Sequence, residues 1–129
     1  MQFTDEMLAL CEELRSLGHD AFASSFAEAY AGKSADEIEQ LKLQDKYEHD
    51  AIREFWKPLQ SADALLVANY DKHGIQHYIG GNAFLEMGFA HVLELPIYLL
   101  NPIPEMPYYH TELIAMKPVV LHGDLAKLA

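Results

Sequence analysis

Tyr78-Ile-Gly-Gly-Asn-Ala-Phe-Leu-Glu86-Met-Gly-Phe-Ala90 is the most informative segment of this chain. The apolar run Ala64–Ala68 precedes it, and a second apolar run, Pro96–Leu100, follows it. This order predicts a strand, a glycine-rich loop, a helix over residues 82–94 and a second strand. Such a loop brings backbone N–H groups to the N-terminus of the helix, where an anion or a sugar hydroxyl can bind.

The predicted strands and helices alternate along this half of the chain. The run Asp63–Asn69 is apolar almost throughout, which is typical of a strand buried on both faces of a parallel sheet. A short helix over 111–116 and a last strand over 118–121 follow the strand at 96–100. We therefore expect an α/β fold, a three-layer sandwich around a parallel, flavodoxin- or Rossmann-like sheet. The 129 residues suit a single domain, 1–129, with one core.

The N-terminal half carries mainly helical patterns. Apolar residues at helical spacing predict a first helix from Thr4 to Leu17, and residues 20–26 then predict a short strand. Ser34-Ala-Asp-Glu37 fits a capping box, so a helix should follow it. That helical pattern reaches Pro58, which should end or kink it, either as one long helix or as two joined near 44–46.

The candidate site lies at the carboxyl ends of the strands, where parallel sheets bind their ligands. Glu86 falls in the first turns of the helix, beside the glycine loop, and is the candidate catalytic group. The candidate substrate-binding residues are Asn69, Tyr70, Tyr78, Gly80, Gly81, Asn82 and Asn101. Some have competing structural roles, because the asparagines can shape turns, the tyrosines can pack the loop and Asn82 can cap the helix.

Composition excludes several classes of partner. A formal net charge of −11 argues against a nucleic acid polymer or an anionic membrane as partner. The single cysteine, Cys11, leaves no intrachain disulfide, and neither a signal peptide nor a membrane-length apolar run is visible, so the cytoplasm is the expected location. His73, His77 and His91 lack metal-ligand spacing, so we expect no metal and no cofactor and read them as surface or loop residues.

With strand, loop and helix in place, the chain resembles the nucleoside 2-deoxyribosyltransferase superfamily, which includes the 2′-deoxynucleoside 5′-phosphate N-glycosidases. The resemblance spans residues 62–124 and is greatest to an uncharacterised bacterial branch with Tyr-Ile-Gly-Gly-Asn and Asn-Pro-Ile-Pro segments. The segments that carry it are Ala62-Asp63-Ala-Leu-Leu-Val67, Gly80–Asn82, Glu86-Met-Gly-Phe-Ala90 and Pro96-Ile-Tyr-Leu-Leu-Asn101.

The resemblance implies a reaction. Glu86 stands where these enzymes have a nucleophile that attacks C1′ of the deoxyribose, releasing the base and forming a glycosyl-enzyme ester, which water or a second base resolves. It also implies that the loop binds the sugar or 5′-phosphate of a small nucleoside or nucleotide, and that the protein is a homo-oligomer. The family begins with a strand that is not found before Thr4. We therefore expect a truncated chain, a direct pairing of 20–26 with 63–69, or a strand from a partner.

Two other functions stay open from the sequence. Gly80 and Phe55 occupy positions where the resemblance implies side chains that assist the chemistry, and this motivates a non-catalytic nucleotide-binding or regulatory protein. The missing first strand motivates a third hypothesis, an incomplete or structural domain without a site of its own.

Overall fold

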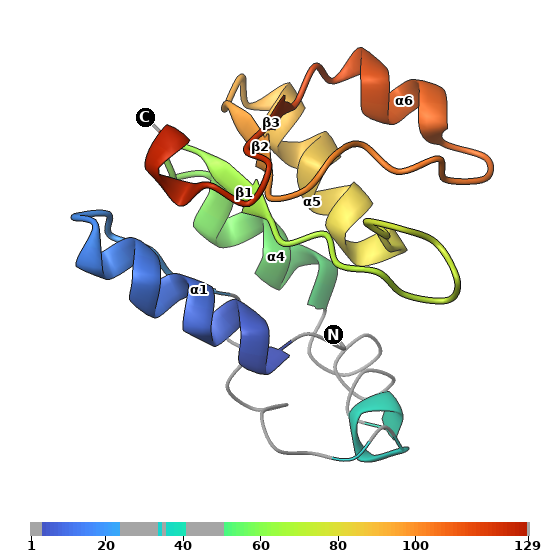
Figure 1. Ribbon diagram of the computed structural model, residues 1–129, viewed down its shortest axis with the longest axis horizontal. Helices are drawn as coiled ribbons and strands as arrows, with labels where there is room; N and C mark the ends of the chain where they lie inside the picture. The colour runs from blue at the N-terminus through green and yellow to red at the C-terminus, as the bar shows by residue number, and fades with distance from the viewer. Residues whose placement is uncertain (1–3, 24–33, 35, 41–50, 129) are drawn as a thin grey trace. The chain divides into compact units, whose positions relative to one another are not determined.

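The computed structural model describes residues 4–23, 34, 36–40 and 51–128 (Figure 1). By their internal contacts the residues group into two units, Met1–Phe55 and Trp56–Ala129. Each unit is described by itself below. The helix α4, Ala51–Leu59, crosses the division between them.

The first unit begins with the helix α1, Thr4–Ser16, which confirms the helix predicted from the apolar spacing. Cys11 and Leu14, one turn apart, are its buried side chains. The strand predicted over 20–26 is wrong for residues 20–23, which have no regular structure, and residues 24–26 lie outside the described part of the chain. The Arg15 Nε atom donates to the Ala21 carbonyl at 2.9 Å, so a side chain takes the backbone acceptor that a strand would offer to a neighbour.

The capping box predicted at Ser34 is confirmed. The Glu37 N–H donates to the Ser34 hydroxyl at 3.2 Å, and the Ser34 N–H donates to the Glu37 carboxylate at 3.4 Å. Residues 36–40 are helical. The predicted junction near 44–46 lies outside the described residues. Pro58 is the penultimate residue of α4, as expected for a proline that ends a helix.

The second unit contains a parallel sheet, which confirms the α/β prediction. Its strands are β1, Leu65–Val67, β2, Ile97–Leu99, and β3, Val119–Val120, in the order β1-β2-β3. Leu65 pairs with Ile97, and Tyr98 pairs with Val119. The strands are shorter than predicted, since polar loop contacts begin directly after them. Within the described residues β1 pairs only with β2, so it is an edge strand there.

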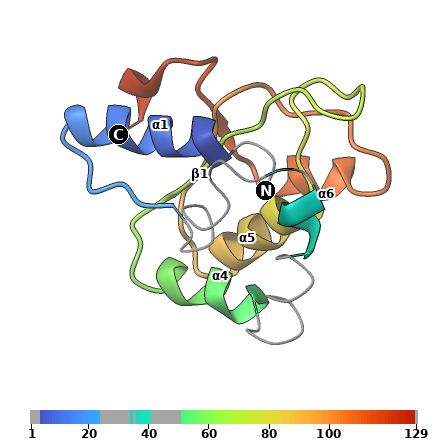
Figure 2. The same ribbon diagram turned by 90° about the horizontal axis from the view of Figure 1, so that it is seen from below.

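Two helices complete the second unit, namely α5, Gly81–Val92, and α6, His110–Ala115, with a final 3-10 turn at Leu125–Lys127. The helix α5 contacts both β1 and β2. Figures 1 and 2 show α4 and α5 side by side, and Trp56 meets Phe89 edge-on with 5.3 Å between ring centroids. The main core cluster consists of Val67, Ile79, Met87, Ala90, Ile97, Leu99, Met106 and Leu113.

Burial of this cluster drives the folding of the unit, since apolar area removed from water stabilises by about 25 cal/mol per Å². Met87 and Ala90 lie one turn apart on α5 and are buried, so they define the face of this helix that packs against the strands. No helix in the described parts of the chain combines the length and the apolar character that crossing a membrane requires.

Candidate functional site

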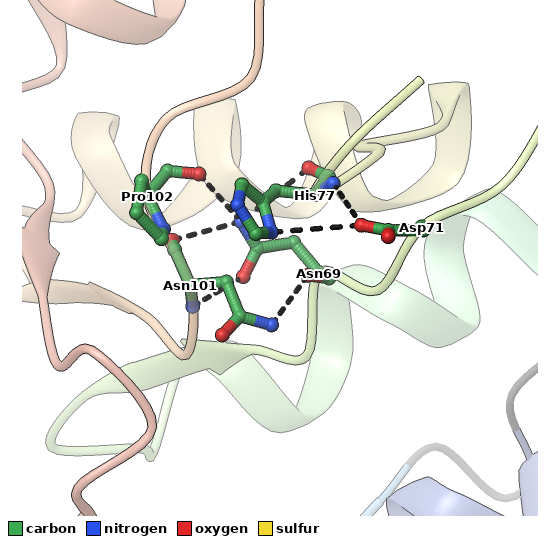
Figure 3. A network of polar contacts seen from close by, with 5 residues as sticks. All are labelled: Asn69, Asp71, His77, Asn101 and Pro102. Atoms are coloured by element: carbon green, nitrogen blue, oxygen red, sulfur yellow. Dashed lines mark hydrogen bonds and ion pairs between the residues drawn. The ribbon is translucent and has the colours of Figure 1, made fainter. Parts of the chain in front are cut away.

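Two asparagines join the carboxyl ends of β1 and β2 (Figure 3). The Asn101 N–H donates to the Asn69 side-chain oxygen at 2.9 Å, and the Asn101 Nδ2 atom donates to the Asn69 carbonyl at 2.9 Å. Each asparagine is the second residue after the end of a strand, where the ladder of backbone bonds would otherwise leave donors and acceptors without partners. The pair therefore fixes the sheet edge at which a ligand would bind.

The Asn69 side chain is fully buried and is occupied by backbone groups. Its Nδ2 atom donates to the carbonyl of Asn101 at 2.9 Å, to that of Pro102 at 3.1 Å and to that of His77 at 3.4 Å. Asn69 is the only buried polar or charged residue in the described parts of the chain. The Asn69 amide thus positions the loops after both strands. Asn101 is half-buried, and its Oδ1 atom forms no hydrogen bond with a described residue.

The loop between β1 and α5 folds back on itself. Lys72 and Ile75 exchange two backbone hydrogen bonds of 3.1 and 2.9 Å around His73 and Gly74. Both central residues have positive φ, 54° and 72°, which defines a type I′ turn and explains the glycine at the second position. The Tyr78 N–H then donates to the Tyr70 carbonyl at 2.9 Å and closes the loop.

His77 has a left-handed backbone that its neighbour Asp71 stabilises. Its φ is 58°, and its N–H donates to the Asp71 carboxylate at 2.9 Å. The same carboxylate oxygen lies 3.7 Å from Nδ1 of the imidazole (Figure 3). Sequence reasoning missed this pair because it treated His77 as a loop residue. An aspartate and a histidine in one loop after a buried strand were the available signal.

The glycine loop begins α5 without help from a side chain. Gly80 is the N-cap residue, and no side chain bonds to the cap; the prediction that Asn82 caps the helix is wrong, since Asn82 lies inside the first turn. The first N–H groups of a helix have no partner within it, and here these include the N–H groups of Gly81 and Asn82. A methyl group on Gly80 would come within 3.1 Å of the Tyr78 ring, so only glycine fits there without a shift.

Aromatic side chains surround this loop. The Tyr78 ring has the Lys72 ammonium 5.7 Å from its centroid and His73 edge-on at 5.3 Å. The Tyr109 hydroxyl donates to the Ile79 carbonyl at 2.6 Å, and its ring stacks on Phe84 at 4.4 Å. Burial, and then the nearby Tyr78, raise the pKa of the Tyr109 hydroxyl.

These contacts assign Tyr78 and Tyr109 to holding the loop. The sequence did not single out Tyr109, because it lies beyond the second strand and reaches the loop only through the fold. Tyr70, the other predicted aromatic contact, is half-buried and joins the loop through its carbonyl.

Glu86 lies in the second turn of α5 and is half-buried. Burial raises the pKa of its carboxyl from 4.5 to about 7. Within the described ranges, no hydrogen bond or ion pair to this carboxyl is recorded. An unpaired carboxyl removed from water is costly, and such groups gather at functional sites.

The flank of α5 that carries Glu86 is defined by helical geometry. Residues one turn apart share a flank, so Asn82 and Phe89 lie on the same side as Glu86, and Trp56 contacts Phe89 there. Phe84 lies two residues from Glu86, about 200° around the helix. The Phe84–Tyr109 stack therefore occupies the opposite flank. Glu86 and Asn82 therefore lie on one flank of α5, whereas Gly80 lies beside the Tyr78 ring.

In the described parts of the chain, no group of three or more His, Cys, Asp or Glu side chains is arranged to hold a metal ion. Comparisons of the chain with models of protein families, with curated proteins and with solved structures found no match.

Proposed function

We propose that this protein is an N-glycosidase or deoxyribosyltransferase that acts on a nucleoside or nucleotide, with Glu86 as the nucleophile. The observation that carries the proposal is the partly buried Glu86 carboxyl, which has no partner among the described residues and whose pKa burial raises to about 7. It stands one and a half turns beyond a glycine loop at the carboxyl end of a parallel strand. A carboxyl in such surroundings is more consistent with chemistry than with packing.

The reaction follows from the carboxylate. Ionised Glu86 attacks C1′ of the sugar, the bond from C1′ to the base nitrogen breaks, and the electron pair leaves with the base. The resulting ester between Glu86 and C1′ is opened by water, which completes hydrolysis, or by a second base, which completes transfer. With a pKa of about 7, roughly half of the Glu86 carboxyls are ionised at neutral pH.

The groups that bind the substrate surround the start of α5. The N–H groups at Gly80, Gly81 and Asn82 are suited to a sugar hydroxyl or a 5′-phosphate. We propose that three groups contact the base or the sugar, namely Tyr70, Tyr78 and the Asn101 Oδ1 atom, which has no partner among the described residues. Asn69 acts through the loops it holds, because its amide is occupied.

We also propose a family, an architecture, an assembly and a location for this protein. Membership of the nucleoside 2-deoxyribosyltransferase superfamily is supported by the parallel order β1-β2-β3 and by the place of Glu86 after the glycine loop. With it we propose the three-layer sandwich as the full architecture, a homo-oligomer as the assembly and the cytoplasm as the location.

Chromatographic detection of free base tests the reaction. The protein is incubated with a panel of deoxynucleosides and their 5′-monophosphates, alongside Glu86→Gln and a matched control, Glu94→Gln, whose exposed side chain follows α5. We expect release by the wild type and the control and none above background by Glu86→Gln. Full release by Glu86→Gln would remove this carboxyl from the mechanism.

A nucleotide-binding protein without turnover is the second candidate. It is favoured by the start of α5, where no side chain occupies the cap, so that a ligand can bind without any chemistry. This candidate predicts that a member of the panel raises the melting temperature while no base is released. Absence of any thermal shift across the panel counts against it.

A further inference from the structure

We propose that His77, oriented by Asp71, is the acid that protonates the departing base. This inference rests on the proposed glycosidase or transferase function and adds a second reacting residue to it. Three features of His77 support this role, namely its backbone conformation, the surroundings of its ring and its place at the edge of the sheet.

The backbone of His77 is strained in a way that the loop maintains. A φ of 58° is uncommon for a residue with a Cβ atom. The Asp71 carboxylate accepts the His77 N–H at 2.9 Å, and the Asn69 amide donates to the His77 carbonyl at 3.4 Å. Both contacts stabilise the one conformation in which the ring lies beside Asp71.

The ring of His77 presents its two nitrogens differently. Nδ1 is buried and, among the described residues, has no hydrogen-bond partner, although Asp71 Oδ1 is 3.7 Å away. The side chain as a whole is 31% exposed, so this exposed area belongs to atoms other than Nδ1. A proton on Nδ1 pointing to Asp71 leaves Nε2 to exchange a proton with a substrate, as in other aspartate–histidine pairs.

Among the described residues, the carboxylate of Asp71 is the charged group that lies against this ring, 3.7 Å from Nδ1. The ends of the two strands contribute Asn69, Asn101 and Pro102, which are uncharged. Lys72 lies instead against the Tyr78 ring. Asp71 is therefore the group that orients the ring, with Nδ1 turned towards its carboxylate.

The place of His77 suits a leaving group. It lies at the carboxyl end of β1, and three residues lead from it to Gly80, the N-cap of the helix that carries Glu86. The loop with His77 and the helix with Glu86 thus both follow β1 in the chain, and Gly80 joins them. Glycosyl transfer with retention requires such a pair, one group to attack and one to protonate the leaving atom.

The proton balance is complete. As the bond from C1′ to the base breaks, its electron pair goes to the base nitrogen, which takes the proton from His77 Nε2 and leaves a neutral imidazole. In the second step, water attacks C1′ and gives its proton to Nε2, while the electron pair of the ester bond returns to Glu86. Protein and base are then restored without any further reactant.

Two substrates with different leaving groups test this role. One is the member of the deoxynucleoside panel from which base is released fastest. The other is 4-nitrophenyl 2-deoxyriboside, whose leaving group departs without a proton. The variants are His77→Asn, since asparagine accepts the left-handed backbone, and the matched control His73→Asn, at a position in the same loop with a φ of 54°.

We expect His77→Asn to lower kcat/KM for the nucleoside by about 100-fold, with a change of less than about 3-fold for the nitrophenyl substrate. His73→Asn should leave both unchanged. Equal losses on both substrates, or no loss on either, would overturn the role of His77. Loss of both reactions in Glu86→Gln together with the expected pattern for His77 supports both residues.

If His77→Asn does not fold, the pH dependence of the wild type still tests the role of His77. The nucleoside reaction should decline at high pH relative to the nitrophenyl reaction, because only the nucleoside needs a proton donor. Parallel profiles for the two substrates would contradict the inference. A wild type that releases neither leaving group overturns the proposed function itself, which is a distinct outcome from a failure of His77 alone.

Discussion

Asn69 and Asn101 exchange hydrogen bonds between side chain and backbone across the ends of two parallel strands, with two of the bonds at 2.9 Å. A third bond of 2.9 Å, from Asn69 Nδ2 to the Asn101 carbonyl, completes the contact. The two residues lie 32 positions apart in the chain. Their contact fixes the edge at which the loop with His77 and the glycine loop begin.

Replacing Asn69 should therefore destabilise the fold strongly. Asn69→Ala leaves buried carbonyl and N–H groups without partners, and we expect a loss of about 2–4 kcal/mol in the free energy of unfolding. Asn101→Ala removes one donor from a half-buried position and should cost about 1 kcal/mol. Urea denaturation of both variants measures the difference, and equal effects would contradict the central place of Asn69.

A methyl group at Gly80 should displace the Tyr78 ring. The added Cβ atom would stand 3.1 Å from the ring carbon, and overpacking of this kind costs about 1–3 kcal/mol. Gly81→Ala is the matched control, since nothing lies within 4 Å of its added Cβ atom. In a Tyr78→Ala background the cost of Gly80→Ala should disappear. Thermal denaturation of this double-mutant cycle tests the contact; a cost that persists without the ring would place the strain elsewhere.

Tyr109→Phe should loosen the glycine loop without removing the aromatic stack. The hydroxyl that donates to the Ile79 carbonyl at 2.6 Å is lost, while the ring stacked on Phe84 remains. We expect a loss of about 1 kcal/mol and faster exchange of amide hydrogens near the start of α5. Phe84→Leu provides a comparison that keeps the hydroxyl, and unchanged exchange in Tyr109→Phe would show that the hydrogen bond does not hold the loop.

Glu86 should make stability fall as pH rises. Its pKa in the folded protein, about 7, lies above its ordinary value of 4.5, so the folded state binds the proton more tightly than the unfolded state. Between these two pH values the wild type loses at most about 3 kcal/mol through this group. Glu86→Gln should therefore be more stable than the wild type at pH 8 and equal to it near pH 4. Melting temperatures across this range measure the difference, which would stay constant with pH if the carboxyl were solvated.

The alternation of strands and helices was predictable because it depends on local patterns. The apolar run before Asn69 and the glycine pair at Gly80 indicated a parallel strand, a loop and a helix, and the sheet order confirms an α/β fold. The places of Asn69 and Asn101 at the ends of two strands were predictable for the same reason, since each ends an apolar run. The capping box at Ser34 was also predictable, because its two residues, Ser34 and Glu37, are only three positions apart.

The remaining features depend on contacts between distant residues or on backbone angles. The segment 20–23 has strand-like composition, but Arg15 takes the Ala21 carbonyl. Asn82 has the right side chain for a cap, yet the helix begins one residue earlier, at Gly81, with Gly80 as the cap. The reach of Tyr109 to Ile79 spans 30 positions, and the left-handed conformation of His77 has no signature in sequence.

The ester on Glu86 is the intermediate that the proposed mechanism requires, and mass spectrometry can detect it. The wild type would be mixed with the substrate from which base is released fastest, quenched in acid within one turnover, digested and examined by mass spectrometry. The proposed mechanism predicts one deoxyribosyl group on the peptide that contains residues 78–90, attached at Glu86 and absent after longer incubation in water. Base release without any such adduct at the earliest times, or with the sugar on another residue, would contradict it.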